Sequence, residues 1–211
     1  MPATPAWPPR SAPRLFIADE IAGGRVVMLE GNQARYLSRV MRVGPGDAVI
    51  LCDDVTGEWA CRVIEADRRT VVVEPLRCLR EREAVPDLWL CPALLKRDRF
   101  DLVLEKATEL GAARIQPLVT RRCVADRLNP DRARSIVTEA AEQCARTALP
   151  ELPAPVPLAA LLETWPVGRT LFFADELGGE PAGQAFAAAG APAALVIGPE
   201  GGFDDPERAL L

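Results

Sequence analysis

The sequence of 211 residues predicts an α/β protein (α+β overall), in which a small β-barrel precedes a domain with a mostly parallel sheet. Two different patterns along the sequence support this prediction. Short strand-like segments separated by turns fill residues 14–77, whereas strand-like and helix-like segments alternate over residues 87–211. Between them, residues 78–86 are charged, carry little periodicity and end in proline, which is typical of a linker.

The N-terminal residues 1–13 contain five prolines and no apolar run. We therefore expect a disordered arm here and no signal peptide. No stretch approaches the roughly 18 apolar residues of a membrane helix, so we expect a cytoplasmic protein without a membrane partner. The six cysteines form no CxxC pair, which favours reduced, mostly buried thiols and predicts no metal site.

In residues 14–77, runs of apolar and β-branched residues predict five short strands. Gly44–Asp47, Asp53–Gly57 and Arg68–Arg69 are expected turns. Asn32 is expected to cap one short helix that ends at Val40. The predicted strands cover residues 15–17, 26–29, 48–52, 59–64 and 71–73.

From residue 87 onward, apolar residues at helical spacing predict a helix over 98–110, followed by Gly111 at its C-terminus. Asn129 is expected to cap a long helix that starts at Pro130 and ends at Leu149. The other expected strands cover 88–95, 115–119, 170–174 and 193–197, and the other helices cover 157–165 and 181–189.

The composition contains no histidine. A Ser-His-Asp or Cys-His nucleophile and a histidine-ligated zinc site are therefore excluded. Proton transfer near neutral pH would need a carboxylate, Lys, Cys, Tyr or solvent, or a reaction with little proton transfer.

Charge is distributed unevenly. The net charge is −5, yet 23 of the 25 basic residues precede Glu151, and residues 151–211 hold 2 basic and 9 acidic residues. The first part of the chain could form a basic patch for nucleic acid although the whole chain is acidic. The alternative is ordinary solvated surface in a sequence with 23 arginines and 2 lysines.

A glycine-rich segment, residues 198–203, follows the most apolar predicted strand and precedes a predicted helix in which Asp204 and Glu207 form a capping box. In a parallel sheet, ligands bind beyond the carboxyl ends of strands. The segment matches neither a P-loop nor GxGxxG, and Glu200 would repel phosphate. It predicts a ligand with a cationic or neutral polar part, or else a tight turn without a ligand. Residues 174–176 form a second candidate loop.

Two further groups stand out. Five cations follow two predicted strands and are expected at one edge of the sheet, where they could contact phosphates or form ordinary loop charge. A polar stripe on the long helix is best interpreted as a solvated face. The cations are Lys96, Arg97, Arg99, Arg121 and Arg122, and the stripe is Glu139, Glu142, Gln143 and Arg146.

Four segments in order carry a resemblance: Tyr36–Asp47, Lys106–Gly111 with Arg122, Glu139–Cys144 with Arg146, and Ile197–Phe203 with Glu207. Together they resemble the SPOUT, or trefoil-knot, methyltransferases that methylate N3 of a specific uridine in 16S ribosomal RNA. The resemblance implies a PUA-like β-barrel for RNA, followed by a SPOUT-type domain that binds S-adenosylmethionine and forms a homodimer. The expected partner is 16S rRNA or the small ribosomal subunit.

The resemblance also implies roles for individual residues. Arg122 is expected to stabilise the uridine anion as the catalytic residue, and no general base is assigned. The expected cofactor-binding residues are Ala174, Asp175, Ile197, Gly198, Pro199, Glu200, Gly201 and Gly202. The expected RNA-binding residues are Arg14, Arg39, Arg42, Lys96, Arg99 and Arg121, and the expected supporting residues are Lys106, Glu109, Gln143 and Arg146.

The chain departs from the family in two respects. Tyr36 stands where many members have histidine, and the sequence stops at Leu211, before the family's knot-forming segment. We therefore expect an incomplete SPOUT domain that binds the cofactor poorly. Two alternatives remain: a chain that acts only as an RNA-binding module, and a protein that binds another nucleotide-like ligand at the glycine-rich segment.

Overall fold

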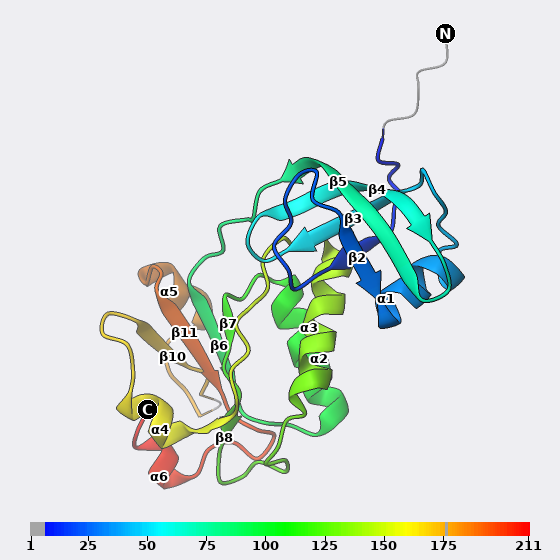
Figure 1. Ribbon diagram of the computed structural model, residues 1–211. Coiled ribbons are helices and arrows are strands. Elements are labelled where there is room, and N and C mark those ends of the chain that lie inside the picture. The colour runs from blue at the N-terminus through cyan, green and yellow to red at the C-terminus, as the bar shows by residue number, and fades with distance from the viewer. Residues whose placement is uncertain (1–6, 176) are drawn as a thin grey trace. The chain divides into compact units, whose positions relative to one another are not determined.

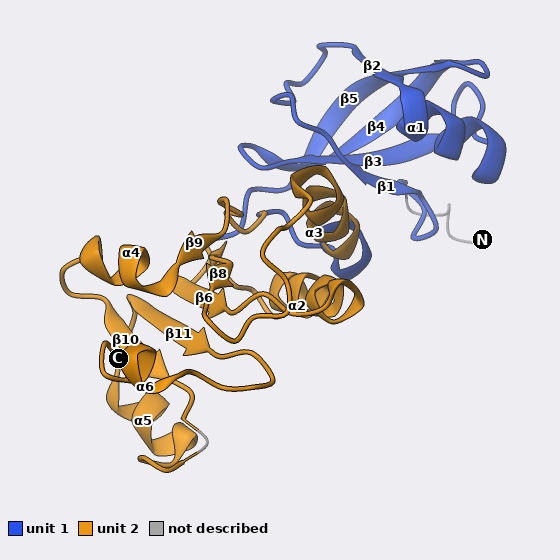
Figure 2. Cartoon of the chain, turned by 90° about the horizontal axis from the view of Figure 1, so that it is seen from below, with its two compact units in different colours: residues 1–84, 141–148 blue, residues 85–140, 149–211 orange. Residues whose placement is uncertain are grey.

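The computed structural model describes residues 7–175 and 177–211 (Figure 1). Residues 1–6 of the predicted arm and Glu176 of the second candidate loop lie outside the described residues, and residues 7–13 form bends and turns. The chain forms two compact units (Figure 2). Unit 1 holds the residues up to Ala84 together with 141–148, and unit 2 holds residues 85–140 and 149–211.

Unit 1 is built on a five-stranded sheet in the order β1-β3-β4-β5-β2. Neighbouring strands are antiparallel except β1 and β3, which are parallel. Register shifts between β4 and β5, such as the one at Glu58 and Trp59, are bulges that bend the sheet. The strands are β1 (Arg14–Phe16), β2 (Val27–Glu30), β3 (Ala48–Asp53), β4 (Gly57–Ala66) and β5 (Thr70–Arg80).

The core of unit 1 comes from alternate residues of its long strands, as the two-residue period of a strand requires. Burial of each large side chain stabilises the unit by about 1.5–3 kcal/mol. The core residues of the strands include Val49, Leu51, Cys61, Val63, Val71 and Val73, and Leu15, Ile21, Leu29, Ala34 and Leu37 complete the cluster.

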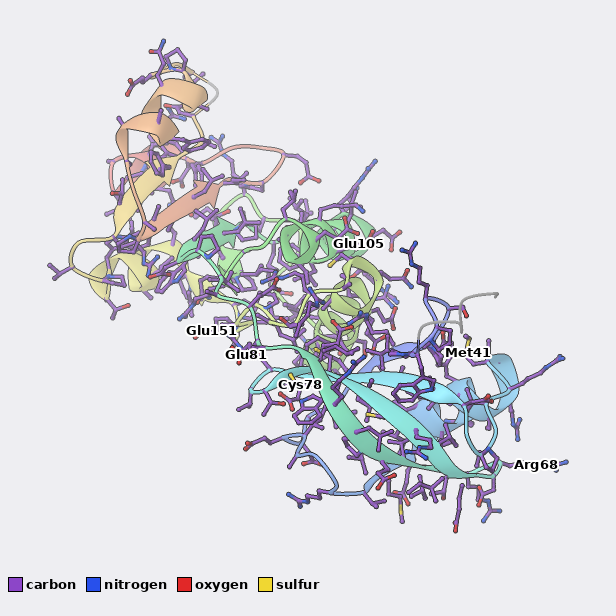
Figure 3. All side chains as sticks on the ribbon, turned by 90° about the horizontal axis from the view of Figure 1, so that it is seen from above. Met41, Arg68, Cys78, Glu81, Glu105 and Glu151 are labelled. Atoms are coloured by element: carbon purple, nitrogen blue, oxygen red, sulfur yellow. The ribbon has the colours of Figure 1, made fainter. Side chains whose placement is uncertain are left out.

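The hairpin between β4 and β5 turns where Arg68 lies (Figure 3). The Asp67 carboxylate closes the turn by accepting hydrogen bonds from the backbone N–H groups of Arg69 and Thr70. Beyond the turn, β5 extends to Arg80 because Cys78 pairs with Trp59 of β4. The strand therefore runs three residues into the segment that we predicted as a linker.

The predicted helix of unit 1 starts and continues differently from the prediction. It begins at Gly31, because Glu30 ends β2 in an extended conformation and serves as the N-cap without a side-chain bond. The predicted cap at Asn32 is therefore wrong. After α1 (Gly31–Arg35) the helix widens into a π-helix, η1 (Tyr36–Val40), a form that is common at functional positions.

Unit 2 contains a four-stranded sheet in the order β10-β11-β6-β7, and all its neighbours are parallel, as predicted. A second, two-stranded parallel sheet joins β8 and β9. The strands are β6 (Leu88–Pro92), β7 (Arg114–Ile115), β8 (Leu118–Val119), β9 (Val156–Pro157), β10 (Thr170–Phe173) and β11 (Ala193–Ile197).

Helices cover both faces of the main sheet. Leu90 of β6 packs with α2 and α3, which lie side by side in Figure 1, whereas its neighbour Cys91 packs with α4 and Phe203 on the other face. No helix among the described residues has the length and apolar composition to cross a membrane. The helices are α2 (Arg97–Glu109), α3 (Pro130–Cys144), α4 (Leu158–Glu163), α5 (Ala182–Ala188) and α6 (Asp205–Arg208).

The predicted strand 88–95 ends at Pro92 and the predicted helix 157–165 covers only Leu158–Glu163, and two further predicted elements are wrong in a more instructive way. The expected strand 115–119 is split into β7 and β8, which belong to different sheets, because Pro117 between them lacks a backbone N–H for a ladder. The long helix ends at Cys144 and not at Leu149, since Ala145 has a φ of 60° and leaves the helical conformation.

The described cysteines are all free. Cys52, Cys61 and Cys91 are buried, and burial raises the pKa of each thiol to about 12. Cys78 and Cys144 are exposed, so the prediction of mostly buried thiols holds for only part of the set.

Candidate functional site

Three loops meet at the carboxyl edge of the strands in unit 2. Residues 198–203 follow β11 and residues 174–175 follow β10, and these two strands are adjacent and parallel. Residues 120–122 follow β8, which lies beside the continuation of β6 through a parallel bridge between Leu118 and Ala93. The loops after these strands therefore leave the same edge, where ligands bind in such folds.

The glycine-rich loop needs glycine for different reasons at different positions. A Cβ on Gly198 would lie 2.8 Å from the ring of Phe203, which packs beneath the loop. Gly202 has a φ of 67°, and its N–H donates to the Pro199 carbonyl at 2.8 Å to close the turn. Glu200 between them is exposed. The loop is therefore a tight turn whose middle is open to a ligand.

Arg122 is attached to this loop. Its Nη1 donates a hydrogen bond to the carbonyl of Gly201 at 2.7 Å, and a Cβ on that glycine would contact the arginine stem at 3.6 Å. The guanidinium is otherwise exposed. It can therefore present a cation to a ligand beside the loop.

The neighbouring Arg121 is tied to the helix that follows the loop. Its backbone N–H donates to Glu207 Oε1 at 2.8 Å, and its side-chain Nε lies 3.4 Å from Asp204 Oδ2. Asp204 and Glu207 form the predicted capping box of α6, which is confirmed. The contact from Glu207 to Arg121 joins residues far apart in sequence, and no local pattern could have indicated it.

The loop after β10 is held by an ion pair that sequence reasoning missed. Arg208 Nη2 lies 2.6 Å from Asp175 Oδ2, and the Arg208 guanidinium lies 5.6 Å from the centre of the Phe173 ring. The hydrogen bonds from Arg208 and from the Leu177 backbone lower the pKa of Asp175. The Phe173 ring packs edge to face against the Phe203 ring, with the ring centres 5.3 Å apart. The same pair of aromatic side chains therefore lies beneath both loops.

A pocket of about 770 Å³ opens beside this loop. Ala174 and Asp175 line it, together with Glu180, Phe186 of α5 and Leu195 of β11. The glycine-rich loop does not contribute to its lining in the described part of the chain. The structure thus places two of the predicted cofactor residues on the pocket wall and the other six, from Ile197 to Gly202, on the adjacent loop.

Comparison with known proteins identifies the family to which the chain belongs. Residues 81–211 match the RNA methyltransferase domain family, and residues 29–76 match the RNA methyltransferase PUA domain. The chain belongs to the RNA methyltransferase family. The predicted resemblance and the predicted fold class are confirmed.

Individual relatives of this methyltransferase agree. It is 33% identical over 207 residues to the ribosomal RNA small subunit methyltransferase E of Synechocystis sp., covering 93% of this chain and 67% of the relative. It is 30% identical over 208 residues to the enzyme of the same name from Mycobacterium tuberculosis, covering 93% and 79%.

A solved structure is also similar. The ribosomal RNA small subunit methyltransferase E of Neisseria gonorrhoeae, bound to S-adenosyl methionine, is 26% identical with a TM-score of 0.84. The match covers 94% of this chain and 84% of that one.

The other predicted cations of the methyltransferase have different surroundings. In unit 2, Lys96 is the N-cap of α2 and Arg99 lies in its first turn, both exposed at the carboxyl edge of the strands. In unit 1, Arg39 and Arg42 are exposed at the end of η1. Arg14 instead donates to Glu58 at 2.6 Å, with a side chain only 17% exposed.

The predicted supporting residues are not gathered at the loops. Lys106 pairs with Glu105 and Glu109 on an exposed part of α2, and these hydrogen bonds raise its pKa to about 12. Because α2 connects two parallel strands, this end of the helix lies at the amino ends of the strands, opposite the carboxyl edge.

Gln143 and Arg146 belong to the segment 141–148 of unit 1. The predicted polar stripe is wrong at Arg146, since the helix ends at Cys144 and the buried Arg146 Nε donates to Glu83 Oε1 at 3.2 Å. Glu142 of the same stripe accepts a hydrogen bond from the Phe16 backbone at 2.7 Å, so it is not simply a solvated side chain.

Proposed function

We propose that this methyltransferase transfers the methyl group of S-adenosylmethionine to N3 of a uridine in the 16S RNA of the small ribosomal subunit, in the cytoplasm. The observation that carries the proposal is the attachment of Arg122 to the glycine-rich loop through the Gly201 carbonyl, at the carboxyl edge of the parallel sheet. The names of the relatives support the class of substrate, and the structure from Neisseria gonorrhoeae supports the cofactor. The uridine and its N3 position come from the sequence resemblance.

The residues at the loops fit S-adenosylmethionine chemically. The molecule carries a sulfonium and an ammonium cation and no phosphate, so the exposed carboxylate of Glu200 does not oppose it. Glu180 adds negative charge to the pocket wall, where Asp175 is paired with Arg208, and Phe186 adds an aromatic side chain. A nucleotide phosphate would meet these acids unfavourably. Ala174, Asp175 and the segment Ile197–Gly202 would hold the cofactor.

The bound cofactor supplies an electrophilic methyl group on sulfur. The chain's own task is to position the uridine and to neutralise the charge that develops on it. N3 of uridine is weakly acidic and reacts as its anion. In this proposal the guanidinium of Arg122, which is hydrogen-bonded to the Gly201 carbonyl beside the loop, stabilises that anion. Such a reaction is compatible with a chain that has no histidine.

RNA binding is proposed for the exposed cations Arg39 and Arg42 of unit 1 and for Lys96, Arg99 and Arg121 of unit 2. The family match over residues 29–76 supports an RNA-binding role for unit 1. Arginine and lysine side chains contact phosphates in this way and make affinity dependent on salt. The sequence resemblance further predicts a homodimer, which light scattering coupled to size-exclusion chromatography measures directly.

The decisive experiment combines two measurements on the chain of 211 residues. Calorimetry with S-adenosylmethionine tests the cofactor, and incubation with unmodified 16S rRNA followed by nucleoside mass spectrometry tests the product. Because 94% of the chain aligns with the S-adenosyl methionine-bound structure from Neisseria gonorrhoeae, we expect cofactor binding and 3-methyluridine, in place of the poor binding expected from the sequence alone. A methyl group at another atom would contradict the proposed position, and RNA binding without cofactor binding would favour the alternative of an RNA-binding module.

A further inference from the structure

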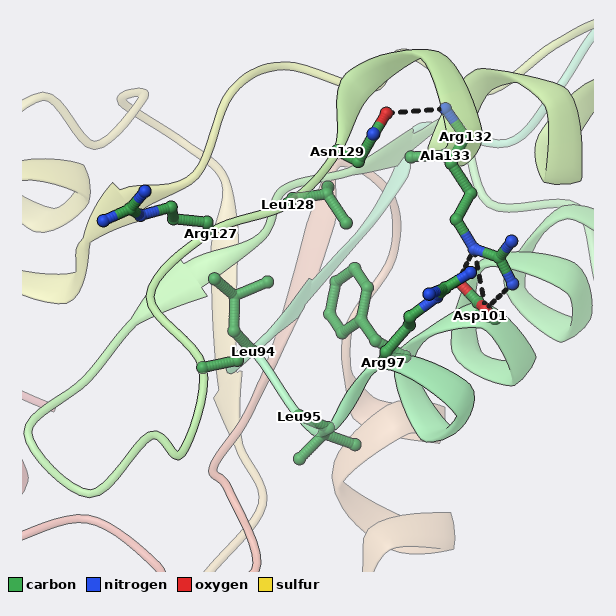
Figure 4. Close-up of a pocket in the computed structure, with 11 residues that line it drawn as sticks. Leu94, Leu95, Arg97, Asp101, Arg127, Leu128, Asn129, Arg132 and Ala133 are labelled. Atoms are coloured by element: carbon green, nitrogen blue, oxygen red, sulfur yellow. Dashed lines mark hydrogen bonds and ion pairs between the residues drawn. The ribbon is translucent and has the colours of Figure 1, made fainter.

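Unit 2 contains another pocket, of about 380 Å³, between the start of α2 and the start of α3 (Figure 4). Its floor is apolar: Leu94 and Phe100 are 1% and 2% exposed, and Leu128 is half-buried. It shares no lining residue with the pocket beside Asp175. A ligand in it would therefore not compete with one held beside Asp175.

Three arginines surround this floor. Arg97 comes from α2, Arg127 from the loop before α3, and Arg132 from α3. In Figure 4, Arg127 lies on one side of the leucines, and Arg97 and Arg132 lie on the other. Asp101 also lines the pocket and is paired with Arg132 at 2.5 Å. Three arginines against one aspartate leave an excess of two positive charges.

The two remaining guanidinium groups are available to a ligand. Arg97 is exposed and has no ion-pair partner within residues 7–175 and 177–211. Arg127 lies 3.7 Å from its neighbour Asp126, but both side chains are at least 80% exposed, and such pairs contribute little. The pocket thus combines a buried apolar floor with unneutralised cations on opposite sides.

The pocket opens at the same edge of unit 2 as Arg122. Leu94 and Arg97 follow β6, whose continuation at Ala93 is bridged to Leu118 of β8, and β8 leads into residues 120–122. Ligand binding at this edge is the rule for parallel sheets.

We infer that this pocket holds an unpaired nucleobase of the RNA substrate, with Arg97 and Arg127 on the flanking phosphates. The inference rests on the proposed function, because it assumes an RNA substrate. A nucleobase is flat and apolar on its faces, so it suits the leucine and phenylalanine floor, and a phosphodiester lies on each side of it along the strand. Arginine is the side chain best shaped for phosphate. An acidic peptide would satisfy the cations but would leave the apolar floor without a matching group.

The test measures binding of a short fluorescein-labelled oligouridylate and of an abasic oligonucleotide with the same number of phosphates, without cofactor. Leu128→Trp fills the pocket without changing charge, and Arg97→Gln and Arg127→Gln each remove one cation. Arg134→Gln is the matched control, because Arg134 is an exposed arginine of α3 that does not line the pocket. Thermal unfolding verifies that each variant folds.

We expect the wild type to prefer the oligouridylate over the abasic strand by about tenfold, which is within the range of single base contacts. Leu128→Trp should abolish this preference and leave abasic binding unchanged. Arg97→Gln and Arg127→Gln should weaken binding of both strands and lower the salt slope by about 1 each. Should Leu128→Trp fail to fold, the arginine variants compared with Arg134→Gln decide the matter.

The inference is overturned if Leu128→Trp keeps the full preference, or if Arg134→Gln loses as much affinity as Arg97→Gln. If polyglutamate displaces the oligouridylate equally well from the wild type and from Leu128→Trp, the arginines bind acidic ligands in general. This result would also overturn the inference. Calorimetry with S-adenosylmethionine and 16S rRNA methylation by the wild type test the proposed function separately. If the wild type methylates 16S rRNA but Leu128→Trp keeps the full preference for the oligouridylate, the proposed function stands and only the inference about this pocket fails.

Discussion

The backbone N–H of Arg121 donates a hydrogen bond to the carboxylate of Glu207 at 2.8 Å. Glu207 is only 8% exposed and also accepts from the Asp204 backbone at 3.3 Å. One buried carboxylate therefore connects the loop that carries Arg122 with the helix that follows the glycine-rich loop. This relationship makes Glu207 a positioning residue for Arg122 under the proposed function.

Glu207→Ala should reduce methylation by about tenfold or more, because small misplacements of catalytic groups are costly. It should also destabilise the protein by about 1–2 kcal/mol through loss of a helix cap. Glu207→Gln keeps the oxygen that accepts from Arg121 and should restore most of the activity. The measurements are kcat with 16S rRNA and the urea midpoint.

Asp204→Ala is the control, because it removes the cap on the Glu207 N–H and the 3.4 Å contact to the Arg121 side chain but leaves the backbone bond from Arg121 to Glu207 in place. It should cost similar stability with a smaller loss of kcat. If Asp204→Ala and Glu207→Ala lose the same amount of kcat, Glu207 acts only as a helix cap and does not position Arg122.

Arg122→Ala should lower kcat by about 100-fold or more, the size expected when a group that stabilises transition-state charge is removed. Arg122→Lys should recover part of it, because the cation is kept while the planar guanidinium is lost. Affinity for S-adenosylmethionine, measured by calorimetry, should change little. Methylation at the wild-type rate in Arg122→Ala, with intact cofactor affinity, would exclude the catalytic role.

Gly198→Ala should destabilise unit 2 by about 1–3 kcal/mol, the usual cost of overpacking. The new Cβ would lie 2.8 Å from the Phe203 ring, which is confined by Phe173 at 5.3 Å. Under the proposed function it should also weaken cofactor binding in calorimetry. Gly183→Ala in α5 meets nothing within 4 Å and should be neutral or slightly stabilising.

The clash itself can be tested by a second change. Phe203→Leu removes the ring atoms that the new Cβ would meet, so it should cost less stability in the Gly198→Ala background than in the wild type. Strictly additive losses in thermal unfolding would show that the glycine is required for another reason.

Local features of the candidate site were predictable from the sequence. The glycine-rich loop and the Asp204–Glu207 box follow from short patterns with a known backbone geometry. The carboxyl edge follows from the alternation of strands and helices. The pairing of Arg122 with Gly201 and of Arg208 with Asp175 could not be predicted, because it depends on which strands become neighbours.

Errors in the predicted elements have similar causes. Pro117 within the expected strand 115–119 was a local signal for a break, and the structure splits the strand there. The end of α3 had no such signal, since Ala145 adopts a φ of 60° without being glycine. There the N–H groups of Thr147 and Ala148 donate to the distant Glu83 carboxylate, so a tertiary contact determines where the helix ends.

Glu58 should make the free energy of unfolding of unit 1 depend on pH in the acidic range. Burial alone would raise the pKa of its carboxyl group, but hydrogen bonds from Arg14 and Arg80, both at 2.6 Å, outweigh burial and lower the pKa below its ordinary value of 4.5. A group whose pKa is lower in the folded state stabilises the fold above the unfolded-state pKa. The contribution is lost as the pH falls through the lowered pKa of the folded state.

Glu58→Gln should therefore cost about 3 kcal/mol at pH 7, where it leaves the two arginines without their buried anion. The difference from the wild type should shrink as the pH falls below about 4.5, where the unfolded wild type becomes protonated, and should be lost below the lowered pKa of the folded state. Urea unfolding of both proteins across this range measures the effect. Asp54→Asn is the control, because the Asp54–Arg82 pair is exposed on both sides and should contribute less than about 1 kcal/mol. A difference between wild type and Glu58→Gln that stays constant down to strongly acidic pH would mean that the carboxylate charge does not stabilise the unit.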